Sequence, residues 1–219
     1  MVANPQETDE PMAQRIGIFG GSFNPVHLGH LIMAECCLAQ AQLDQILFVP
    51  AAIPPHKQHE QLAPCDVRLE MLQLAIGGHD HFSACGIECD RGGTSYTVDT
   101  VAALRQQAAD DEFWLILGPD ALAGLPTWRE PARLLTLTGI LALERQGTDD
   151  LAAVLSAPAL ESLLTDKQRH QILADRVRVP AIDIRASQIR LAVAAGQSIR
   201  FRTPRAVERL IESRQLYRD

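Results

Sequence analysis

The chain has 219 residues, of which 47% are hydrophobic and 21% charged, and its formal net charge is −7. This composition is typical of a globular protein with one sizeable core, and the acidic balance argues against a broad nucleic-acid-binding surface, which is usually basic. No apolar run approaches the roughly 20 residues that span a bilayer, and the polar N-terminal segment does not resemble a signal peptide. We therefore expect a cytoplasmic protein that binds neither nucleic acid nor membrane.

Strand-like apolar runs alternate with segments of helical periodicity, a pattern typical of a parallel sheet covered on both faces. The expected strands are Ile16–Phe19, Ile46–Val49, Phe82–Glu88, Phe113–Leu117, Ile140–Leu143 and Arg176–Val179, and the expected helices include Leu28–Ala41, Val67–Ile76, Val98–Ala108 and Pro131–Leu135. Residues 147–175 are hard to assign, and two helical patterns close the chain after Pro180. The sequence predicts an α/β, Rossmann-like, doubly wound parallel sheet with a C-terminal helical closure. This fold would form one domain over residues 15–219, after a disordered tail over residues 1–14.

The segment after the first expected strand, Gly20-Gly21-Ser22-Phe23-Asn24-Pro25-Val26-His27-Leu28-Gly29-His30, has the features of a phosphate site. Its first two glycines permit a tight turn. Asn24 suits a helix N-cap and Pro25 the first helical position, so backbone N–H groups at that helix end would face an anion. The two histidines would share one helix face, and Gly29 would leave room for a flat ligand on the backbone.

The five cysteines are an odd number in a chain large enough to fold without disulfides, so we expect reduced thiols in the core. Cys85 and Cys89 would share a face of a strand. Two pairs of histidines lack the further ligands of a recognisable zinc site, so we expect no metal held by protein side chains alone.

The first motif resembles the signature of the nucleotidylyltransferases, whose H-x-G-H histidines hold the phosphates of a nucleoside triphosphate. Later segments resemble, in order, those of the bacterial nicotinate-nucleotide adenylyltransferases: Pro54-Pro55-His56-Lys57, Arg68 with Met71, Ser95-Tyr96-Thr97-Val98-Asp99-Thr100, Gly118-Pro119-Asp120, Leu125-Pro126-Thr127-Trp128 and Ile184-Arg185-Ala186-Ser187-Gln188-Ile189-Arg190. The chain departs from this pattern at Asn24, where aspartate is usual, at Pro119, where alanine is common, and at Arg185, which replaces a small residue.

The resemblance implies transfer of AMP from ATP to nicotinate mononucleotide in NAD biosynthesis, with release of pyrophosphate and without a covalent intermediate. It implies that His27, His30 and Arg190 are catalytic and that Mg²⁺ bridges the triphosphate oxygens. The expected ATP-binding residues are Gly20, Gly21, Ser22, Phe23, His27, Gly29, His30, Asp120, Ser187 and Arg190. The expected nicotinate mononucleotide-binding residues are Lys57, Tyr96, Thr97, Trp128, Arg129 and Arg145.

The C-terminal motif has its own local argument. A helix that begins at Ser187 would place this hydroxyl at the N-cap and Arg190 at the third helical position, where a guanidinium opposes the helix dipole. A bound anion would remove this conflict.

The residues leave other functions open. The acceptor could be nicotinamide mononucleotide or phosphopantetheine, and a non-catalytic nucleotide-binding protein could carry the same first motif. The sequence also leaves open whether the chain forms a homo-oligomer.

Overall fold

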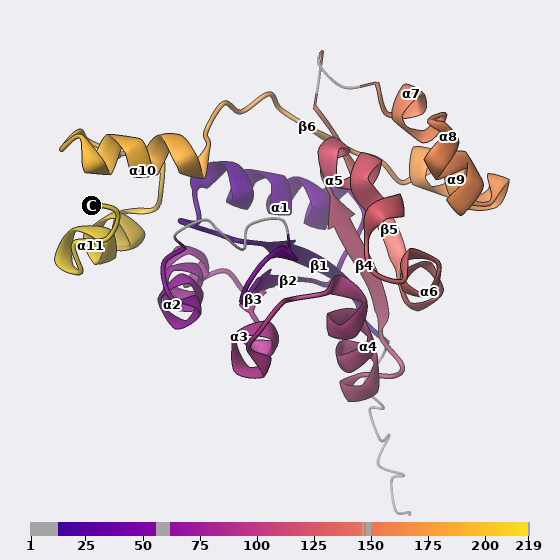
Figure 1. The fold of residues 1–219 in the computed structure, drawn as a ribbon, viewed down its shortest axis with the longest axis horizontal. Coiled ribbons are helices and arrows are strands. Elements are labelled where there is room, and N and C mark those ends of the chain that lie inside the picture. The colour runs from indigo at the N-terminus through magenta and orange to yellow at the C-terminus, as the bar shows by residue number, and fades with distance from the viewer. Residues whose placement is uncertain (1–12, 56–61, 146, 148–149, 219) are drawn as a thin grey trace, which may run out of the picture.

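The computed structural model describes residues 13–55, 62–145, 147 and 150–218, and its centre is a sheet of six parallel strands in the order β3-β2-β1-β4-β5-β6 (Figure 1). The strands are β1 (Arg15–Gly21), β2 (Gln45–Pro50), β3 (Phe82–Ala84), β4 (Glu112–Leu117), β5 (Gly139–Arg145) and β6 (Val177–Val179). The strand order reverses between β1 and β4, which is the switch point at which doubly wound sheets bind ligands. The predicted fold class is confirmed.

Helices pack on both faces of the sheet (Figure 1). They are α1 (Leu28–Gln40), α2 (Cys65–Ile76), α3 (Ile87–Arg91), α4 (Thr97–Gln107), α5 (Pro119–Gly124), the 3-10 helix η2 (Leu125–Thr127), α6 (Pro131–Leu137), α7 (Leu151–Leu155), α8 (Pro158–Leu163), α9 (Asp166–Ala174), α10 (Ala186–Ala194) and α11 (Arg205–Ser213). Successive side chains of a strand point to opposite faces, so Leu141 and Leu143 join one apolar cluster while Ile140 and Ala142 join the other.

The C-terminal closure is formed by α10 and α11, and α11 packs against α2 (Figure 1). Val207 and Ile211 of α11 are buried, as their spacing predicts. Residues 147–175, which were hard to assign from the sequence, contain the short helices α7, α8 and α9 in their described part. None of the helices in the described ranges is long and apolar enough to cross a membrane.

The third strand is shorter than predicted. It ends at Ala84, and the chain turns through Gly86 into α3, so Cys89 is helical and the predicted strand Phe82–Glu88 is wrong in its second half. Glu88 and Asp90 lie in the first turn of α3, where negative charge complements the helix dipole.

The first helix begins at Leu28, as its periodicity predicts, but its N-cap lies later than the predicted Asn24. Its N-cap is His27 and its first residue Leu28, while Asn24 and Pro25 lie in the preceding turn and are joined by a cis peptide bond. The side chain of Asn24 is engaged in tertiary hydrogen bonds, described below, and does not cap a helix.

Helix α10 is shifted in the opposite direction. Its N-cap is Arg185, so Ser187 is the second helical residue and Arg190 the fifth. The predicted N-cap role of Ser187 and the predicted third position of Arg190 are therefore wrong. Arg190 is a full turn into the helix, and the argument from the dipole at its first turn no longer applies.

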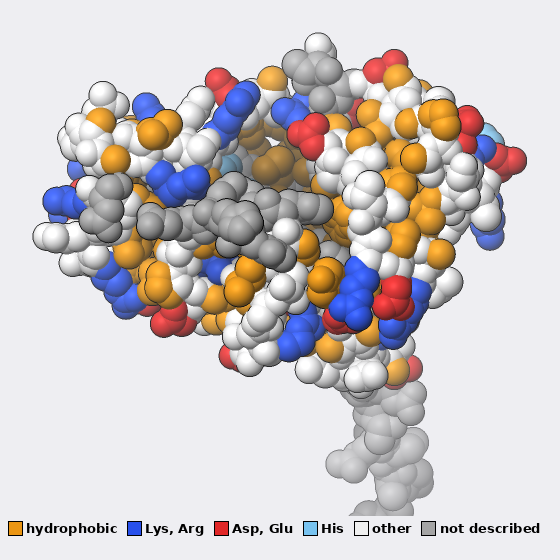
Figure 2. Space-filling view, viewed as in Figure 1, with side chains coloured by type: hydrophobic (Ala, Val, Ile, Leu, Met, Phe, Trp, Pro, Cys, Tyr) orange, Lys and Arg blue, Asp and Glu red, His pale blue; other side chains and the backbone are white. Residues whose placement is uncertain are grey.

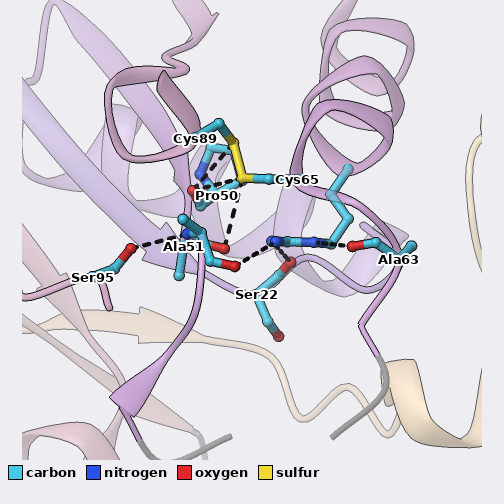
Figure 3. Close-up of a disulfide and its surroundings, with 9 residues drawn as sticks. Ser22, Pro50, Ala51, Ala63, Cys65, Cys89 and Ser95 are labelled. Atoms are coloured by element: carbon cyan, nitrogen blue, oxygen red, sulfur yellow. Dashed lines mark hydrogen bonds between the residues drawn. A yellow bond between two sulfur atoms is a disulfide. The ribbon is translucent and has the colours of Figure 1, made fainter. Parts of the chain in front are cut away.

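The expectation that all five cysteines are reduced thiols is wrong for two of them. Cys65 at the start of α2 and Cys89 in α3 form a disulfide with a Cα–Cα distance of 5.5 Å, while Cys36, Cys37 and Cys85 are free (Figure 3). The two half-cystines are 24 residues apart and meet beside Pro50 at the end of β2, a proximity created by the sheet.

Most of the predicted N-terminal tail, residues 1–12, lies outside the described residues. Gln14 is held at the amino ends of the two central strands, β1 and β4. Its backbone N–H donates to Asp111 Oδ1 at 3.0 Å, and its carbonyl accepts from the Glu112 N–H at 2.7 Å.

Candidate active site

A cavity of about 280 Å³ lies at the switch point of the sheet, against the carboxyl ends of β1, β2 and β4. The space-filling view shows this face hollowed, with hydrophobic side chains inside the hollow (Figure 2). The cavity brings together seven residues predicted from two separate motif groups: Gly20, Gly21, Ser22, Tyr96, Thr97, Trp128 and Arg129. The expected phosphate turn and the expected pyridine-binding residues therefore share one cavity.

One wall of the cavity is the N-terminus of α4. Tyr96 is the N-cap and has no side-chain capping bond, and Thr97 is both the first helical residue and part of the cavity lining. The first N–H groups of a helix have no intrahelical acceptor and lie at the positive end of its dipole. This wall is suited to a small anionic group such as a carboxylate.

The aromatic wall is formed by Trp128 and Tyr96. The Arg129 guanidinium lies 4.6 Å from the centroid of the Tyr96 ring and pairs with Asp99 Oδ2 at 3.8 Å. The Trp128 backbone N–H donates to Leu125 O at 3.1 Å, which fixes this residue at the end of η2. Flat rings held in this way can stack on a planar heterocycle.

The two histidines of the first motif form a stacked pair at the start of α1. Their ring centroids are 3.6 Å apart, and the His27 backbone N–H donates to His30 Nδ1 at 3.2 Å. Because His30 Nδ1 accepts this bond, the neutral His30 ring carries its proton on Nε2. His30 is therefore a donor through Nε2, on the side of the ring away from the bond.

Both histidines are neutral at pH 7. Burial lowers the pKa of His27 to about 4, and burial together with the neighbouring His27 lowers the pKa of His30 well below its ordinary value. His27 Nδ1 is also buried without a hydrogen-bond partner among the described residues. The pair thus offers neutral imidazoles to a ligand rather than positive charge.

The structure explains the glycine at position 29 by local packing. A Cβ at this position would lie 3.0 Å from His27 Nδ1 and 3.5 Å from Ile182 Cγ2, so the glycine makes space for the His27 ring. Its predicted contact with ATP stays a prediction.

Phe23 holds an uncommon backbone conformation in the turn after β1. Its φ angle is +44°, in the left-handed region, which costs a non-glycine residue about 1–3 kcal/mol. The ring is buried, with its centroid 5.0 Å from that of His30, and a Cβ on Gly21 would lie 3.2 Å from it. Packing of the ring thus holds the turn and requires a glycine at position 21.

Asn24 links this turn to two distant parts of the chain. Its carbonyl accepts from Arg190 Nη1 at 2.8 Å, and its Oδ1 accepts from the Ala63 N–H at 3.1 Å and from the Tyr217 hydroxyl at 2.7 Å. Burial raises the pKa of Tyr217, which therefore remains a donor. The Arg190 guanidinium is thereby fixed next to the histidine motif, as the resemblance implies.

Nine predicted site residues are not among the described lining residues of the cavity. Five of them belong to the histidine motif and its partner from α10, described above: Phe23, His27, Gly29, His30 and Arg190. Of the other four, Asp120, Arg145 and Ser187 do not occur in the lining either, and Lys57 lies outside the described residues. Asp120 is the second residue of α5, which follows β4, and Arg145 is the last residue of β5. Both therefore lie at the carboxyl ends of strands, at the same edge of the sheet. Their roles, and those of Ser187 and Lys57, stay predictions.

Sequence reasoning assigned no role to two charged residues at this site. Glu88 lines the cavity, is buried and accepts from Thr100 Oγ1 at 2.6 Å. Arg68 is 1% exposed, and its hydrogen bonds within the described residues all go to backbone carbonyls. Its sequence signal was present, because Arg68, Met71 and Leu72 share the apolar face of one helix, where an arginine is unusual.

Comparison with known proteins shows that the chain is a nucleotidyltransferase. Residues 18–192 match the family described as cytidylyltransferase-like. The chain belongs to this family, and within it to the nicotinate-nucleotide adenylyltransferases.

The second assignment rests on curated relatives. A probable nicotinate-nucleotide adenylyltransferase of Thermomicrobium roseum is 42% identical over 208 residues, which cover 93% of this chain and 92% of the relative. A second one, of Geobacillus thermodenitrificans, is 41% identical over 203 residues, which cover 93% of this chain and 86% of the relative.

A solved structure supports the fold. The nicotinic acid mononucleotide adenylyltransferase of Plasmodium falciparum, complexed with NaAD, superposes with a TM-score of 0.67. The match covers 93% of this chain and 97% of that chain at 16% identity, so it bears on the fold alone.

Proposed function

We propose that the chain transfers the adenylyl group of ATP to nicotinate mononucleotide, forming nicotinate adenine dinucleotide and pyrophosphate. The observation that carries this proposal is the shared cavity, in which the turn Gly20–Ser22 lies with Trp128 and the N-terminus of α4. The names of the relatives agree with this activity. This activity, together with the net charge of −7, also favours a cytoplasmic enzyme without a nucleic-acid or membrane partner.

The pyridine half of the acceptor fits the wall formed by Trp128 and α4. We propose that the ring stacks on Trp128 and that its carboxylate accepts from backbone N–H groups at Thr97 and Arg129. Such groups are donors only, so a carboxylate satisfies them, whereas the NH₂ of a carboxamide would face donors without a partner. This arrangement favours the acid over the amide.

The triphosphate half fits the first motif. Its oxygens would accept from N–H groups of the Gly20–Phe23 turn and from His30 Nε2, while Arg190 supplies positive charge from α10. Because both histidines are neutral, the positive charge that the protein brings to this motif comes from the Arg190 guanidinium. These groups would stabilise the charge that develops as pyrophosphate departs.

The reaction needs no general base from the protein. The phosphate of the mononucleotide has a second pKa of about 6 and is largely ionised at pH 7. One of its oxygens forms the new bond to the α-phosphorus of ATP, and the bond from that phosphorus to the bridging oxygen of pyrophosphate breaks with its electron pair. No proton has to move at the enzyme, and no residue is modified.

We propose Mg²⁺ as the cofactor, entering with ATP and neutralising phosphate oxygens. This ion needs few protein ligands, because it keeps several waters and is held largely by substrate phosphates. The described residues contain no group of three or more histidine, cysteine, aspartate or glutamate side chains that could hold a metal by themselves. Added EDTA should stop turnover, and excess Mg²⁺ should restore it.

The deciding experiment is pyrophosphate release from ATP with a panel of acceptors. Nicotinate mononucleotide should give pyrophosphate and a dinucleotide of the expected mass, and omission of the acceptor should give neither. Nucleotide binding without pyrophosphate from any acceptor would instead identify a binding protein. Release with phosphopantetheine alone would identify a different member of the superfamily.

A further inference from the structure

The buried arginine of α2 connects the loops that form the cavity. Arg68 Nη1 donates to Ser22 O at 2.8 Å, Nη2 to Ala52 O at 3.0 Å and Nε to Ala63 O at 2.8 Å. The first carbonyl follows β1, the second follows β2 and the third precedes α2 (Figure 3). Three separate segments of the chain therefore share one guanidinium.

The bond to Ser22 fixes the direction of a neighbouring donor. In a planar trans peptide the C=O and the N–H point in opposite directions, and the Ser22–Phe23 bond is not among the cis bonds of the described residues. Since Ser22 O points at Arg68, the Phe23 N–H points away from Arg68. The φ of +44° at Phe23 is unfavourable in isolation, so this peptide plane needs an outside restraint.

The bond to Ala52 fixes the opposite side of the cavity. The Ala52 N–H donates to Ser95 Oγ at 2.9 Å, and the Ser95 N–H donates to Ile53 O at 3.0 Å. The following residues, Pro54 and Pro55, line the cavity. Arg68 thus fixes the proline wall and the phosphate turn relative to each other.

We propose that Arg68 is a positioning residue for adenylyl transfer. It holds the Phe23 N–H toward the triphosphate and the 51–55 loop toward the acceptor, without touching either substrate. Its planar fork with several fixed donors suits this task, whereas a lysine has a single charged nitrogen on a flexible stem. This inference rests on the proposed function and assigns to it a residue that lies behind the cavity wall.

A matched control exists at the other edge of the sheet. Arg105 donates from Nε to Leu137 O at 2.9 Å and from Nη1 to Asp111 O at 3.5 Å. These carbonyls precede β5 and β4, so Arg105 also bridges loops through carbonyls but at the end of the sheet opposite to the cavity. Substitution of Arg105 should therefore lower the stability of the protein and leave the position of the cavity loops unchanged.

The test compares Arg68→Lys with Arg105→Lys, with kcat, KM and thermal unfolding measured for both and for the wild type. A misplacement of reacting groups by about 1 Å costs about 10²-fold, so Arg68→Lys should lower kcat/KM by about 10²-fold, mostly in kcat, at a temperature at which it is folded. Arg105→Lys should leave kcat/KM within about threefold, whatever its unfolding temperature. Equal kcat/KM for folded Arg68→Lys and wild type would overturn the proposal, as would equal losses in the two variants.

A second measurement on the wild type covers the case in which Arg68→Lys does not fold. Inorganic pyrophosphate should shift the Phe23 amide resonance strongly, and the resonances at Leu137 and Asp111 little. No response at Phe23 on saturation with pyrophosphate would overturn the orientation argument. The failure of the proposed function is a separate result, because it would appear as a wild type that releases no pyrophosphate from ATP and nicotinate mononucleotide.

Discussion

The backbone N–H of His27 donates to Nδ1 of His30 while the two imidazoles stack, so the first histidine fixes both the orientation and the tautomer of the second. Protonation of His30 at Nδ1 would break this bond. The neutral state is thus part of the geometry of the motif, and acid should disturb the site as well as the fold.

Acid should lower the stability of the protein over the range in which the histidines titrate. A histidine in the unfolded chain binds a proton below about pH 6.5, whereas His27 in the folded protein binds one only below about pH 4. The unfolded state therefore binds more protons in this window, and the free energy of unfolding falls as the pH falls from 6.5 to about 4. At 1.36 kcal/mol per pKa unit, His27 accounts for about 3 kcal/mol. Urea unfolding at several pH values across this range should show the free energy of unfolding falling with pH, and His27→Gln should make this dependence weaker. An unchanged pH dependence in the variant would show that groups other than His27 cause it.

His30 should matter more to turnover than to folding. His30→Ala removes the Nε2 donor, and the loss of one such donor typically costs about 10²–10³ in rate. The fold should lose the bond from the His27 N–H, worth about 1 kcal/mol, and the packing of the ring against His27 and Phe23. The control is His170→Ala in the exposed part of α9, which should be fully active. More than half of the wild-type rate in His30→Ala at saturating substrates would refute the assignment.

Arg190 should act on ATP rather than on the acceptor. Arg190→Ala should raise the KM for ATP and lower kcat, and leave the KM for the mononucleotide less affected, because its charge lies next to the histidine motif. Arg190→Lys should recover part of the loss, since it keeps the charge without the planar fork. Arg209→Ala, on the exposed face of α11, is the control. If Arg190→Ala and this control had the same kinetics, Arg190 would be a structural residue.

The disulfide should add stability. It closes a loop of about 24 residues, for which chain entropy predicts about 3 kcal/mol. The double variant Cys65→Ser, Cys89→Ser should therefore unfold at lower urea concentration than the wild type, and a reductant should shift the wild type toward the variant. Cys36→Ser, at a free cysteine, should respond to reductant as the wild type does. An identical midpoint for double variant and oxidised wild type would show that the bond is absent in solution.

The acceptor preference should follow the donors at Thr97 and Arg129. We expect nicotinate mononucleotide to exceed nicotinamide mononucleotide by at least ~10-fold in kcat/KM, about 1.4 kcal/mol. Trp128→Ala should lower the use of both acceptors with a smaller change in their ratio, because any pyridine ring stacks. Trp114→Phe, at the amino end of β4, is the matched control. Equal use of the two acceptors by the wild type would contradict the donor pocket.

The sheet and its motifs could be predicted because their signals are local. Strand residues such as Ile16 and Leu115 belong to short apolar runs, and the alternation with helices then implies the parallel sheet. The carboxyl ends of such strands meet at one edge, so residues as distant as Gly20 and Trp128 could be expected near each other.

The errors have non-local causes. Asparagine is a residue type that often caps helices, but the Asn24 side chain instead accepts hydrogen bonds from Ala63 and Tyr217. No local sequence pattern indicates those contacts. The parity of the cysteines favoured reduced thiols, whereas the pairing of Cys65 with Cys89 depends on where β2 brings α2 and α3. Element boundaries and cross-links were therefore wrong where a tertiary contact overrides a local preference.

The bond between the Tyr217 hydroxyl and Asn24 spans 193 positions of the chain. The turn at Asn24 is thus completed by a residue that is synthesised 193 positions later. During translation the early strands can pair and the first helix can form, but the turn at Asn24 lacks this partner until Tyr217 has emerged. Any product that terminates before Tyr217 would carry the intact signature in its sequence and an unfinished turn in its structure.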